Sequence, residues 1–178
     1  RRLTETSRNY LKAQQHNRLL DLNQEKIESI SHFVEDIALP YIDEHEGKVE
    51  FIPLENALAI TADTYWLGIC MKNIIENAVT HGEFPVKISL SAEKNKVLFK
   101  VQDQGQCQFE SLGIMTREFV KGNKSSGTGL GMNIVKKVCR EMGIDLTLDL
   151  NPTVFTMGIP LTQSGPAKAF NPLIARIK

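Results

Sequence analysis

A chain of 178 residues is long enough for one domain with a real hydrophobic core. Its 21 basic residues equal its 21 acidic ones, which gives no reason to expect nucleic acid or an anionic membrane surface as a partner. The three cysteines form no CxxC pair, which disfavours a disulfide framework and a structural zinc site and favours a reducing, cytoplasmic setting. No apolar run reaches the roughly 18 to 20 residues that span a bilayer.

The N-terminal part of the chain is predicted to be helical. Residues 1–39 contain neither Gly nor Pro and are rich in Leu, Gln, Glu, Arg and Lys, so we expect helix with a break near Asn23 and an end at Pro40. Apolar positions are sparse up to Leu22, which predicts an arm that pairs with another helix. From Ile27 they become regular, which predicts a helix packed on a globular body.

The middle of the chain alternates between strand and helix patterns. VEFIPL (49–54) and ALAIT (57–61) are typical of short strands, and Asp63 is a suitable N-cap for an apolar helix over residues 64–80. VKISLSA (86–92) and VLFKVQD (97–103) then predict a hairpin. Three polar residues discussed below, Asn73, Asn77 and Asp103, lie in these segments.

The C-terminal part begins with a long irregular segment. Residues 104–130 have little periodicity, so we expect a functional lid or disorder. A helix should follow and stop at Gly143, and IDLTLDL (144–150) with TVFTMGIPL (153–161) predicts a second hairpin. Residues 162–178 mix Ser, Gly and Pro with polar residues, which is typical of a linker.

A glycine string precedes the predicted helix. Gly127, Gly129 and Gly131 leave the backbone unshielded at a helix start, where unpaired N–H groups and the positive end of the helix dipole favour a phosphate. The alternative is a flexible turn in front of an amphipathic helix. The string alone does not decide between them.

Two further polar features leave alternatives open. Asn73, Asn77 and His81 recur every four residues and share a helix face, which is either a wet face or a source of amide oxygens for Mg²⁺. Asp103 ends a strand. It either caps the turn at Gly105 or accepts a hydrogen bond from an exocyclic amine, with Gly105 letting a flat ring approach.

The order and spacing of four motifs decide among these readings. NIIENAVTH (73–81), VQDQGQC (101–107), EFVKGNKSSGTGLGMNIVKKV (118–138) and TVFTMGIPL (153–161) together resemble the catalytic, ATP-binding domain of sensor histidine kinases. That superfamily also includes DNA gyrase, MutL and the ninety-kilodalton heat-shock chaperone. The resemblance covers residues 27–161. It implies an α/β two-layer sandwich, with a mixed, mostly antiparallel sheet packed on three helices and ATP between the first motif's helix and a lid.

The resemblance also implies roles for individual residues. Asn77 would bind Mg²⁺, Asn73 would face the phosphates or take part in catalysis, and Asp103 would bind the adenine amino group. Lys121, in the same motif as Phe119, and Lys124 are candidates for charge at the γ-phosphate, although both are equally suited to a solvated lid. Thr156, next to Phe155, would lie behind the adenine. The remaining expected nucleotide contacts are Gly105, Gly127, Thr128, Gly129, Leu130 and Gly131.

The same resemblance divides the chain and names its partners. Residues 1–24 would end a dimerisation and phosphoacceptor helix, residues 25–161 would form the catalytic domain, and residues 162–178 would be a linker or tail. His16 lacks the acidic neighbour typical of an acceptor, so we expect the phosphorylated histidine to lie before Arg1. The expected partners are the protein's own dimerisation domain in a homodimer and a response regulator or receiver domain, with the whole protein cytoplasmic or anchored in an inner membrane.

Two alternative functions remain at this point. A gyrase-like or MutL-like ATPase needs a glutamate base four residues before the magnesium asparagine, and that position is Asn73 here. A degenerate nucleotide-binding module is suggested by two departures from the family pattern. Cys107 replaces a glycine, and Thr80 stands where many members carry a basic residue.

Overall fold

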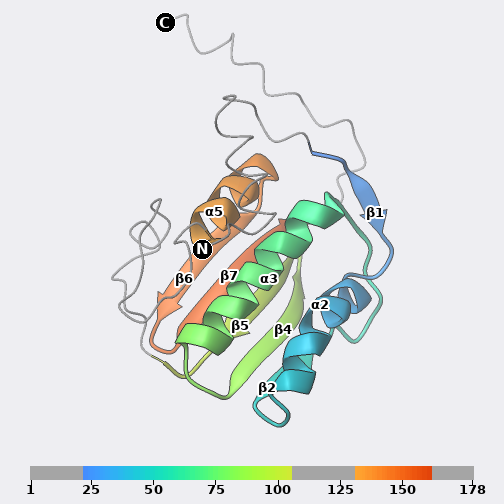
Figure 1. The fold of residues 1–178 in the computed structure, drawn as a ribbon. Coiled ribbons are helices and arrows are strands. Elements are labelled where there is room, and N and C mark those ends of the chain that lie inside the picture. The colour runs from blue at the N-terminus through green and yellow to red at the C-terminus, as the bar shows by residue number, and fades with distance from the viewer. Residues whose placement is uncertain (1–21, 106–130, 162–178) are drawn as a thin grey trace, which may run out of the picture.

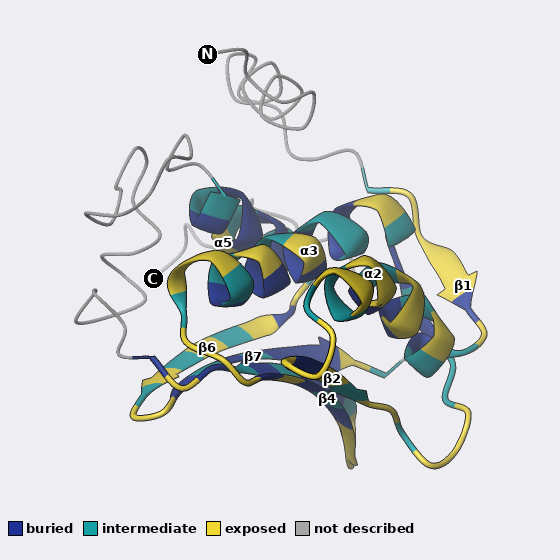
Figure 2. Ribbon diagram, turned by 60° about the horizontal axis from the view of Figure 1, so that its bottom comes forward, coloured by how far each residue is buried: buried dark blue, intermediate teal, exposed yellow. Residues whose placement is uncertain are grey.

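The computed structural model describes residues 22–105 and 131–161, and these residues form two layers. Three helices cover one face of a five-stranded sheet, as Figures 1 and 2 show. The helices are α2 (Ile30–Glu44), α3 (Thr64–His81) and α5 (Gly131–Glu141). The strands of the sheet are β2 (Val49–Ile52), β4 (Val86–Glu93), β5 (Lys96–Gln102), β6 (Asp145–Leu150) and β7 (Thr153–Pro160), and a separate pair is formed by β1 (Glu25–Ile27) and β3 (Ile60–Ala62).

The sheet has the order β2-β4-β5-β7-β6. Strand β2 runs parallel to β4, and the other neighbours are antiparallel, which confirms the predicted mixed and mostly antiparallel sheet. Both predicted hairpins, β4–β5 and β6–β7, are present. Alternate residues of each strand point to opposite faces, and the apolar set on β5 and β7 lies under the helices: Val97, Phe99, Val101, Phe155, Met157 and Ile159.

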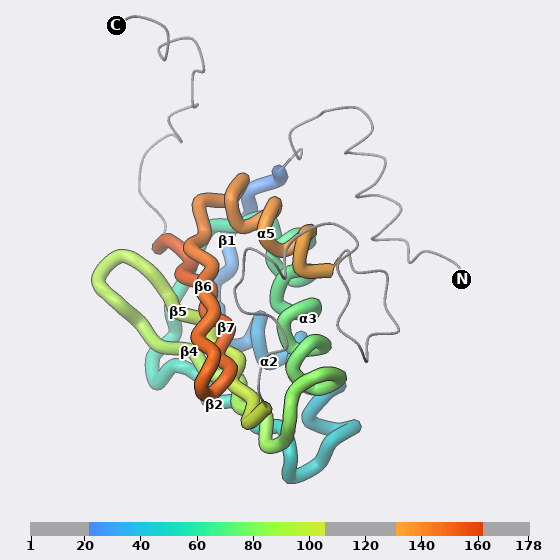
Figure 3. Tube along the Cα trace, turned by 90° about the vertical axis from the view of Figure 1, so that its left-hand side faces the viewer, coloured from blue at the N-terminus to red at the C-terminus, as the bar shows by residue number. Residues whose placement is uncertain are grey.

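Helix α3 is the central helix of its layer (Figure 1). It begins where the sequence predicts, because the side chain of Asp63 accepts a hydrogen bond from the Trp66 N–H at 2.9 Å. Its apolar face is buried against the sheet, and Figure 3 shows the helix and the strands as separate layers from the side. Its polar residues Asn73, Asn77 and His81, which lie four positions apart, are not fully buried and form what we call the polar strip.

Helix α5 packs beside α3. Cys70 on α3 and Cys139 on α5 are both buried, and a hydrogen bond between their thiols, together with burial, raises the pKa of Cys70. Gly143 follows α5 with a φ of +66°, a conformation that favours glycine, which explains why the helix stops as predicted. This packing places the start of α5 next to the middle of α3.

The sequence predicts helix on both sides of a break near Asn23, and this prediction is wrong for residues 25–27. Residues 25–27 form β1, whose pairing with β3 overrides their local helix preference, and the helix begins only after Ser29, whose hydroxyl caps it. Residues 1–21 lie outside the described part of the chain. The predicted strand at 57–61 is also displaced, because β3 spans 60–62.

The predicted helix end at Pro40 is wrong as well. Helix α2 contains Pro40 and continues to Glu44. A proline removes one N–H from the helix ladder, but Pro40 and Asp36, the residue four positions earlier, are both exposed, so the helix tolerates the lost hydrogen bond on its solvent side. Among the described helices, none is both long enough and apolar enough to cross a bilayer.

Candidate functional site

The middle of α3 and the first residue of α5 meet at Asn73. This side chain is half-buried, and its amide nitrogen donates a hydrogen bond to the Ile69 carbonyl oxygen at 2.8 Å. A Cβ added at Gly131 would lie only 2.5 Å from Asn73 Oδ1. The absence of a side chain at Gly131 is therefore what lets the start of α5 approach the asparagine.

Asn77 continues the polar strip one helical turn further along α3. It is half-buried, and His81, another turn on, is exposed at the end of the helix. Thr80 is exposed too. The structure therefore presents the amide of Asn77 on the same strip as Asn73, between the start of α5 and the C-terminal end of α3.

The N-terminus of α5 supplies a second kind of group. The first N–H groups of an α-helix have no partner within the helix, and they lie at the positive end of its dipole. Gly131 begins this helix. The other residues of the predicted glycine string and lid lie outside the described residues: Cys107, Phe119, Lys121, Lys124, Gly127, Thr128, Gly129 and Leu130.

Asp103 closes the other end of the site, where β5 ends. It is only 4% exposed, and its Oδ1 accepts hydrogen bonds from the N–H groups of Gly105 (2.7 Å) and Glu83 (3.4 Å). Asp103 therefore caps the turn at Gly105, which is one of the two roles that the sequence left open. Burial raises the pKa of Asp103, the two backbone hydrogen bonds oppose that rise, and the charge of Glu83 adds to it.

Both hydrogen bonds to Asp103 from described residues use Oδ1. Its second carboxylate oxygen remains an acceptor for a donor that approaches the end of β5. Capping and ligand binding are therefore compatible in one carboxylate, because each oxygen has its own lone pairs.

Two glycines bring α3 and β5 together around Asp103. A Cβ at Gly82 would meet the Asp103 carboxyl group and the Ala78 carbonyl oxygen, the latter at 2.6 Å. A Cβ at Gly105 would lie 2.9 Å from Asp103 Oδ1. The Gln104 N–H also donates to the Glu83 carbonyl at 2.9 Å. The end of α3 and the turn after β5 are thus fixed relative to each other.

Thr153 belongs to this cluster, although none of the sequence motifs points to it. It is 5% exposed, and its hydroxyl donates to the Gly105 carbonyl at 2.8 Å. Its own carbonyl accepts from the Asp103 N–H at 3.1 Å. The available signal was the strand alternation, since Thr153 shares a face with Phe155 and Met157, which are buried under the helices.

Thr156, the threonine that we expected behind the adenine, lies on the other face of the sheet. It pairs with Lys100 on β5 and Thr147 on β6, and its neighbours Phe155 and Met157 point into the core. The structure does not bring Thr156 together with Asp103. An odd offset along a strand reverses the face, so Thr153 and Thr156 cannot both face the helices.

The described groups form a strip along α3 with different chemistry at its two ends. Helix N–H groups and asparagine amides lie at one end, and a buried carboxylate lies at the other. Gly82, the C-cap of α3, lies nine positions after Asn73, which corresponds to roughly 14 Å along the helix axis. Such a strip fits an elongated ligand that has anionic groups at one end and a hydrogen-bond donor at the other.

Comparison with known proteins agrees with this geometry. The family described as histidine kinase-, DNA gyrase B- and HSP90-like ATPases matches residues 62–163, more than half of the chain. The sensor histidine kinase VxrA of Vibrio cholerae is 32% identical over 160 residues, which cover 90% of this chain and 30% of that protein. The chain thus spans less than a third of the length of this curated relative.

Solved structures share the fold. The histidine kinase AdeS of Acinetobacter baumannii has a TM-score of 0.71 and 17% identity, and the match covers 89% of this chain and 78% of that one. Full-length ShkA in complex with AMPPNP has a TM-score of 0.65 and 22% identity, covering 95% of this chain and 42% of that one. Fold, motif order and family match agree, and this chain belongs to the family of histidine kinase-, DNA gyrase B- and HSP90-like ATPases.

Proposed function

We propose that this chain is the ATP-binding catalytic domain of a two-component sensor histidine kinase. The observation that carries the proposal is the contact between Asn73 and Gly131, which joins the asparagine motif on α3 to the glycine motif at the start of α5. The match to VxrA supports the kinase assignment within the family. The AMPPNP in the ShkA structure supports adenine nucleotide as the ligand.

The residues present fit ATP and Mg²⁺. A side chain at position 131 would fill the space against Asn73, so the glycine leaves room for phosphate oxygens beside the N–H groups of α5. Asn77 would hold Mg²⁺, which neutralises phosphate charge when bound. The second oxygen of Asp103 would accept from the adenine amino group. Gly127, Thr128, Gly129, Leu130, Lys121 and Lys124 remain candidates for further phosphate contacts.

The γ-phosphate would pass to a histidine outside residues 1–178. Residues 1–24 would end the dimerisation and phosphoacceptor helix, and residues 162–178 would lead away as a linker or tail. The partners would be the homodimer's own phosphoacceptor domain and a response regulator or receiver domain. When the 178-residue chain is incubated with radiolabelled ATP, we expect it to acquire no stable phosphohistidine. Stable label on this chain would refute that placement.

A gyrase-like ATPase is a weaker candidate for this chain. Its catalytic base would occupy position 73, where the Asn73 amide donates its N–H to the Ile69 carbonyl and has no carboxylate to take a proton from water. We therefore expect hydrolysis by the isolated chain to be slow. A robust ATPase rate would reverse this ranking.

Titration calorimetry with AMPPNP tests nucleotide binding directly. The wild-type chain should bind AMPPNP more tightly with Mg²⁺ than without it. Asn77→Ala should lose Mg²⁺-dependent binding with an unchanged melting temperature, and Thr80→Ala, an exposed change on the same helix, should bind as the wild type does. Equal affinity of the wild type and Asn77→Ala would remove Asn77 from the site. No binding by the wild type would favour a degenerate, pseudokinase-like module.

A further inference from the structure

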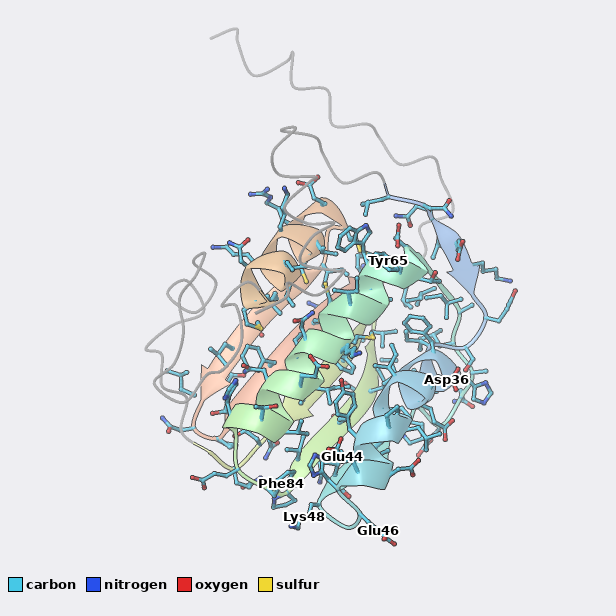
Figure 4. The ribbon with its side chains drawn as sticks, viewed as in Figure 1. Asp36, Glu44, Glu46, Lys48, Tyr65 and Phe84 are labelled. Atoms are coloured by element: carbon cyan, nitrogen blue, oxygen red, sulfur yellow. The ribbon has the colours of Figure 1, made fainter. Side chains whose placement is uncertain are left out.

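The loop between α3 and β4, residues 82–85, carries a phenylalanine that is not part of the buried core. Phe84 is 38% exposed, and Figure 4 shows it beside Lys48, near the C-terminal ends of α2 and α3. Exposed hydrophobic side chains are common on protein surfaces, so exposure alone identifies no role. The contacts of Phe84 and of its neighbour in the chain do identify one.

Two side chains from the turn after α2 contact the Phe84 ring. The His45 ring lies 5.1 Å from it between centroids, tilted by 44°, and Lys48 Nζ lies 5.6 Å from its centroid. Both distances are within the range of favourable ring–ring and cation–π contacts. The turn itself is closed, because the N–H groups of Lys48 and Val49 donate to the His45 carbonyl at 2.9 and 3.2 Å. Phe84 therefore packs against a turn that backbone hydrogen bonds hold in place.

Glu83, the residue before Phe84, joins the same loop to the turn at Asp103. Its N–H donates to Asp103 Oδ1 at 3.4 Å, and its carbonyl accepts from the Gln104 N–H at 2.9 Å. The 3.4 Å contact is long for an N–H···O hydrogen bond, whereas the Gly105 N–H donates to the same oxygen at 2.7 Å. A small shift of the loop would break the longer bond first. The position of the loop therefore decides how firmly the Asp103 carboxylate is held.

Backbone hydrogen bonds anchor the loop at both ends. The Gly82 N–H donates to the Ala78 carbonyl at 2.9 Å, and the Val86 N–H donates to the Lys48 carbonyl at 2.8 Å. Between these anchors, the ring of Phe84 gives the loop a side-chain contact with the turn after α2. Removing the ring would leave the middle of the loop free to move between two fixed ends.

We propose that Phe84 is a positioning residue for adenine recognition, because its ring holds Glu83 where the Glu83 N–H keeps the Asp103 carboxylate oriented toward the nucleotide. Phe84 acts through Glu83 and does not touch the nucleotide itself. The inference rests on the proposed function, since Asp103 meets an adenine amine only if the chain binds ATP. The contacts from Phe84 to the Asp103 turn exist without nucleotide, so they can be tested separately.

Amide hydrogen exchange of the nucleotide-free, 178-residue chain tests the contacts within the protein. Phe84→Ala should speed exchange of the Glu83 and Gln104 amides about fivefold, because both open with the loop. The Ile144 amide, which donates to the Cys139 carbonyl after α5, should exchange as in the wild type. Phe84→Tyr keeps the ring and should restore the wild-type rates.

Two results of the exchange measurement would overturn the proposal, whether or not the chain binds nucleotide. One is unchanged exchange at Glu83 and Gln104 in Phe84→Ala. The other is equal acceleration at these two amides and at Ile144, which would indicate a general loss of stability and no local effect of the ring.

Calorimetry separates positioning of Asp103 from a general effect on the site. Phe84→Ala should weaken AMPPNP binding about fivefold, and it should weaken binding of an analogue that lacks the exocyclic amine by less than about twofold. Phe84→Tyr should bind AMPPNP as the wild type does. Ile52→Ala on β2, where the side chain is 42% exposed, is the matched control and should change neither affinity. An equal loss for both nucleotides in Phe84→Ala would refute the positioning role.

A double variant tests whether Phe84 acts through Asp103. In an Asp103→Asn background, Phe84→Ala should cause no further loss of AMPPNP affinity, because residues that act through one contact are not additive. A further loss of about fivefold would show a separate contribution and overturn the proposal. Failure of the wild type to bind AMPPNP would instead refute the proposed function, and the exchange rates would still decide whether Phe84 holds the Asp103 turn.

Discussion

Two aspartates lie at opposite ends of α3 and are buried to almost the same extent, yet they use their oxygens differently. Asp63, 5% exposed, accepts one hydrogen bond on each oxygen, from Trp66 and from Asn23. Asp103, 4% exposed, accepts both of its hydrogen bonds from described residues on Oδ1. Residue type and burial are the same, and only the distribution of donors differs.

This difference separates a structural carboxylate from one suited to a ligand. Each buried oxygen needs a partner, because an unsatisfied polar group costs about 1–3 kcal/mol. Both oxygens of Asp63 have partners within the protein, so this residue caps α3 and holds Asn23 beside it. Asp103 holds its turn with one oxygen, and no described residue donates to the other, which leaves that oxygen as an acceptor for the proposed ligand. The two ends of α3 can be tested by the same substitution.

Asp103→Asn should have the largest effect, on nucleotide affinity. The amide keeps an oxygen for the Gly105 and Glu83 N–H groups but turns an NH₂ toward the adenine amine, so we expect affinity for AMPPNP to fall about 100-fold. Calorimetry measures the change. An analogue that lacks the exocyclic amine serves as the control, since the substitution should cost it little. An equal loss for both nucleotides would show that Asp103 does not bind the amine.

Asp63→Asn should instead lower stability. Its NH₂ would face the N–H of Asn23 or of Trp66, leaving one donor unsatisfied, and the free energy of unfolding should drop by about 1–3 kcal/mol. Urea denaturation measures this drop. AMPPNP affinity of the folded variant should equal that of the wild type. If Asp63→Asn weakened binding as strongly as Asp103→Asn, the proposed division between the two aspartates would be wrong.

Thr153→Val should have a smaller effect at the Asp103 end. It removes the hydroxyl that donates to the Gly105 carbonyl, and we expect a loss of about 1 kcal/mol in unfolding free energy together with weaker nucleotide binding. Thr156→Val, on the other face of the same strand, is the matched control and should leave nucleotide affinity unchanged. A larger loss of affinity in Thr156→Val would restore the original assignment.

The smallest effect should be a difference in pH dependence. A raised pKa means that folded Asp103 holds its proton more tightly than the unfolded chain does, so ionisation works against folding. As pH rises from about 4 through the raised pKa, the wild type should lose stability relative to Asp103→Asn, which does not titrate there. Melting temperatures of the two proteins over this range measure the difference. A constant difference, or one of opposite sign, would contradict the raised pKa.

Much of the fold could be predicted because its signals are local. The cap at Asp63, the stop at Gly143 and the two hairpins depend on residues close together in sequence, and all are present. The errors occurred where the tertiary arrangement decides. Strand β1 forms because β3 is available to pair with it, and α2 continues through Pro40 because that face of the helix is exposed.

For the candidate site, the motifs selected Asn73, Asp103, Gly131 and Thr156, and the structure places only Thr156 on the sheet face away from the helices. A motif locates a segment and does not state which face of a strand each residue occupies. Thr153 and Thr156 differ by three positions, so the register of β7 against β5 decides which one lies on the helix side. Thr153 was therefore found only from its hydrogen bond to Gly105.

Periodicity, capping and motif spacing predicted the family, most of the elements and the residue types of the candidate site, because these signals belong to short segments of the sequence. The tertiary structure alone decided that Asn73 touches Gly131, that Thr153 supports the Asp103 turn, and that Asp63 holds Asn23. These contacts join residues 40 to 58 positions apart. Their geometry depends on how the helices and the sheet pack, which no local pattern specifies.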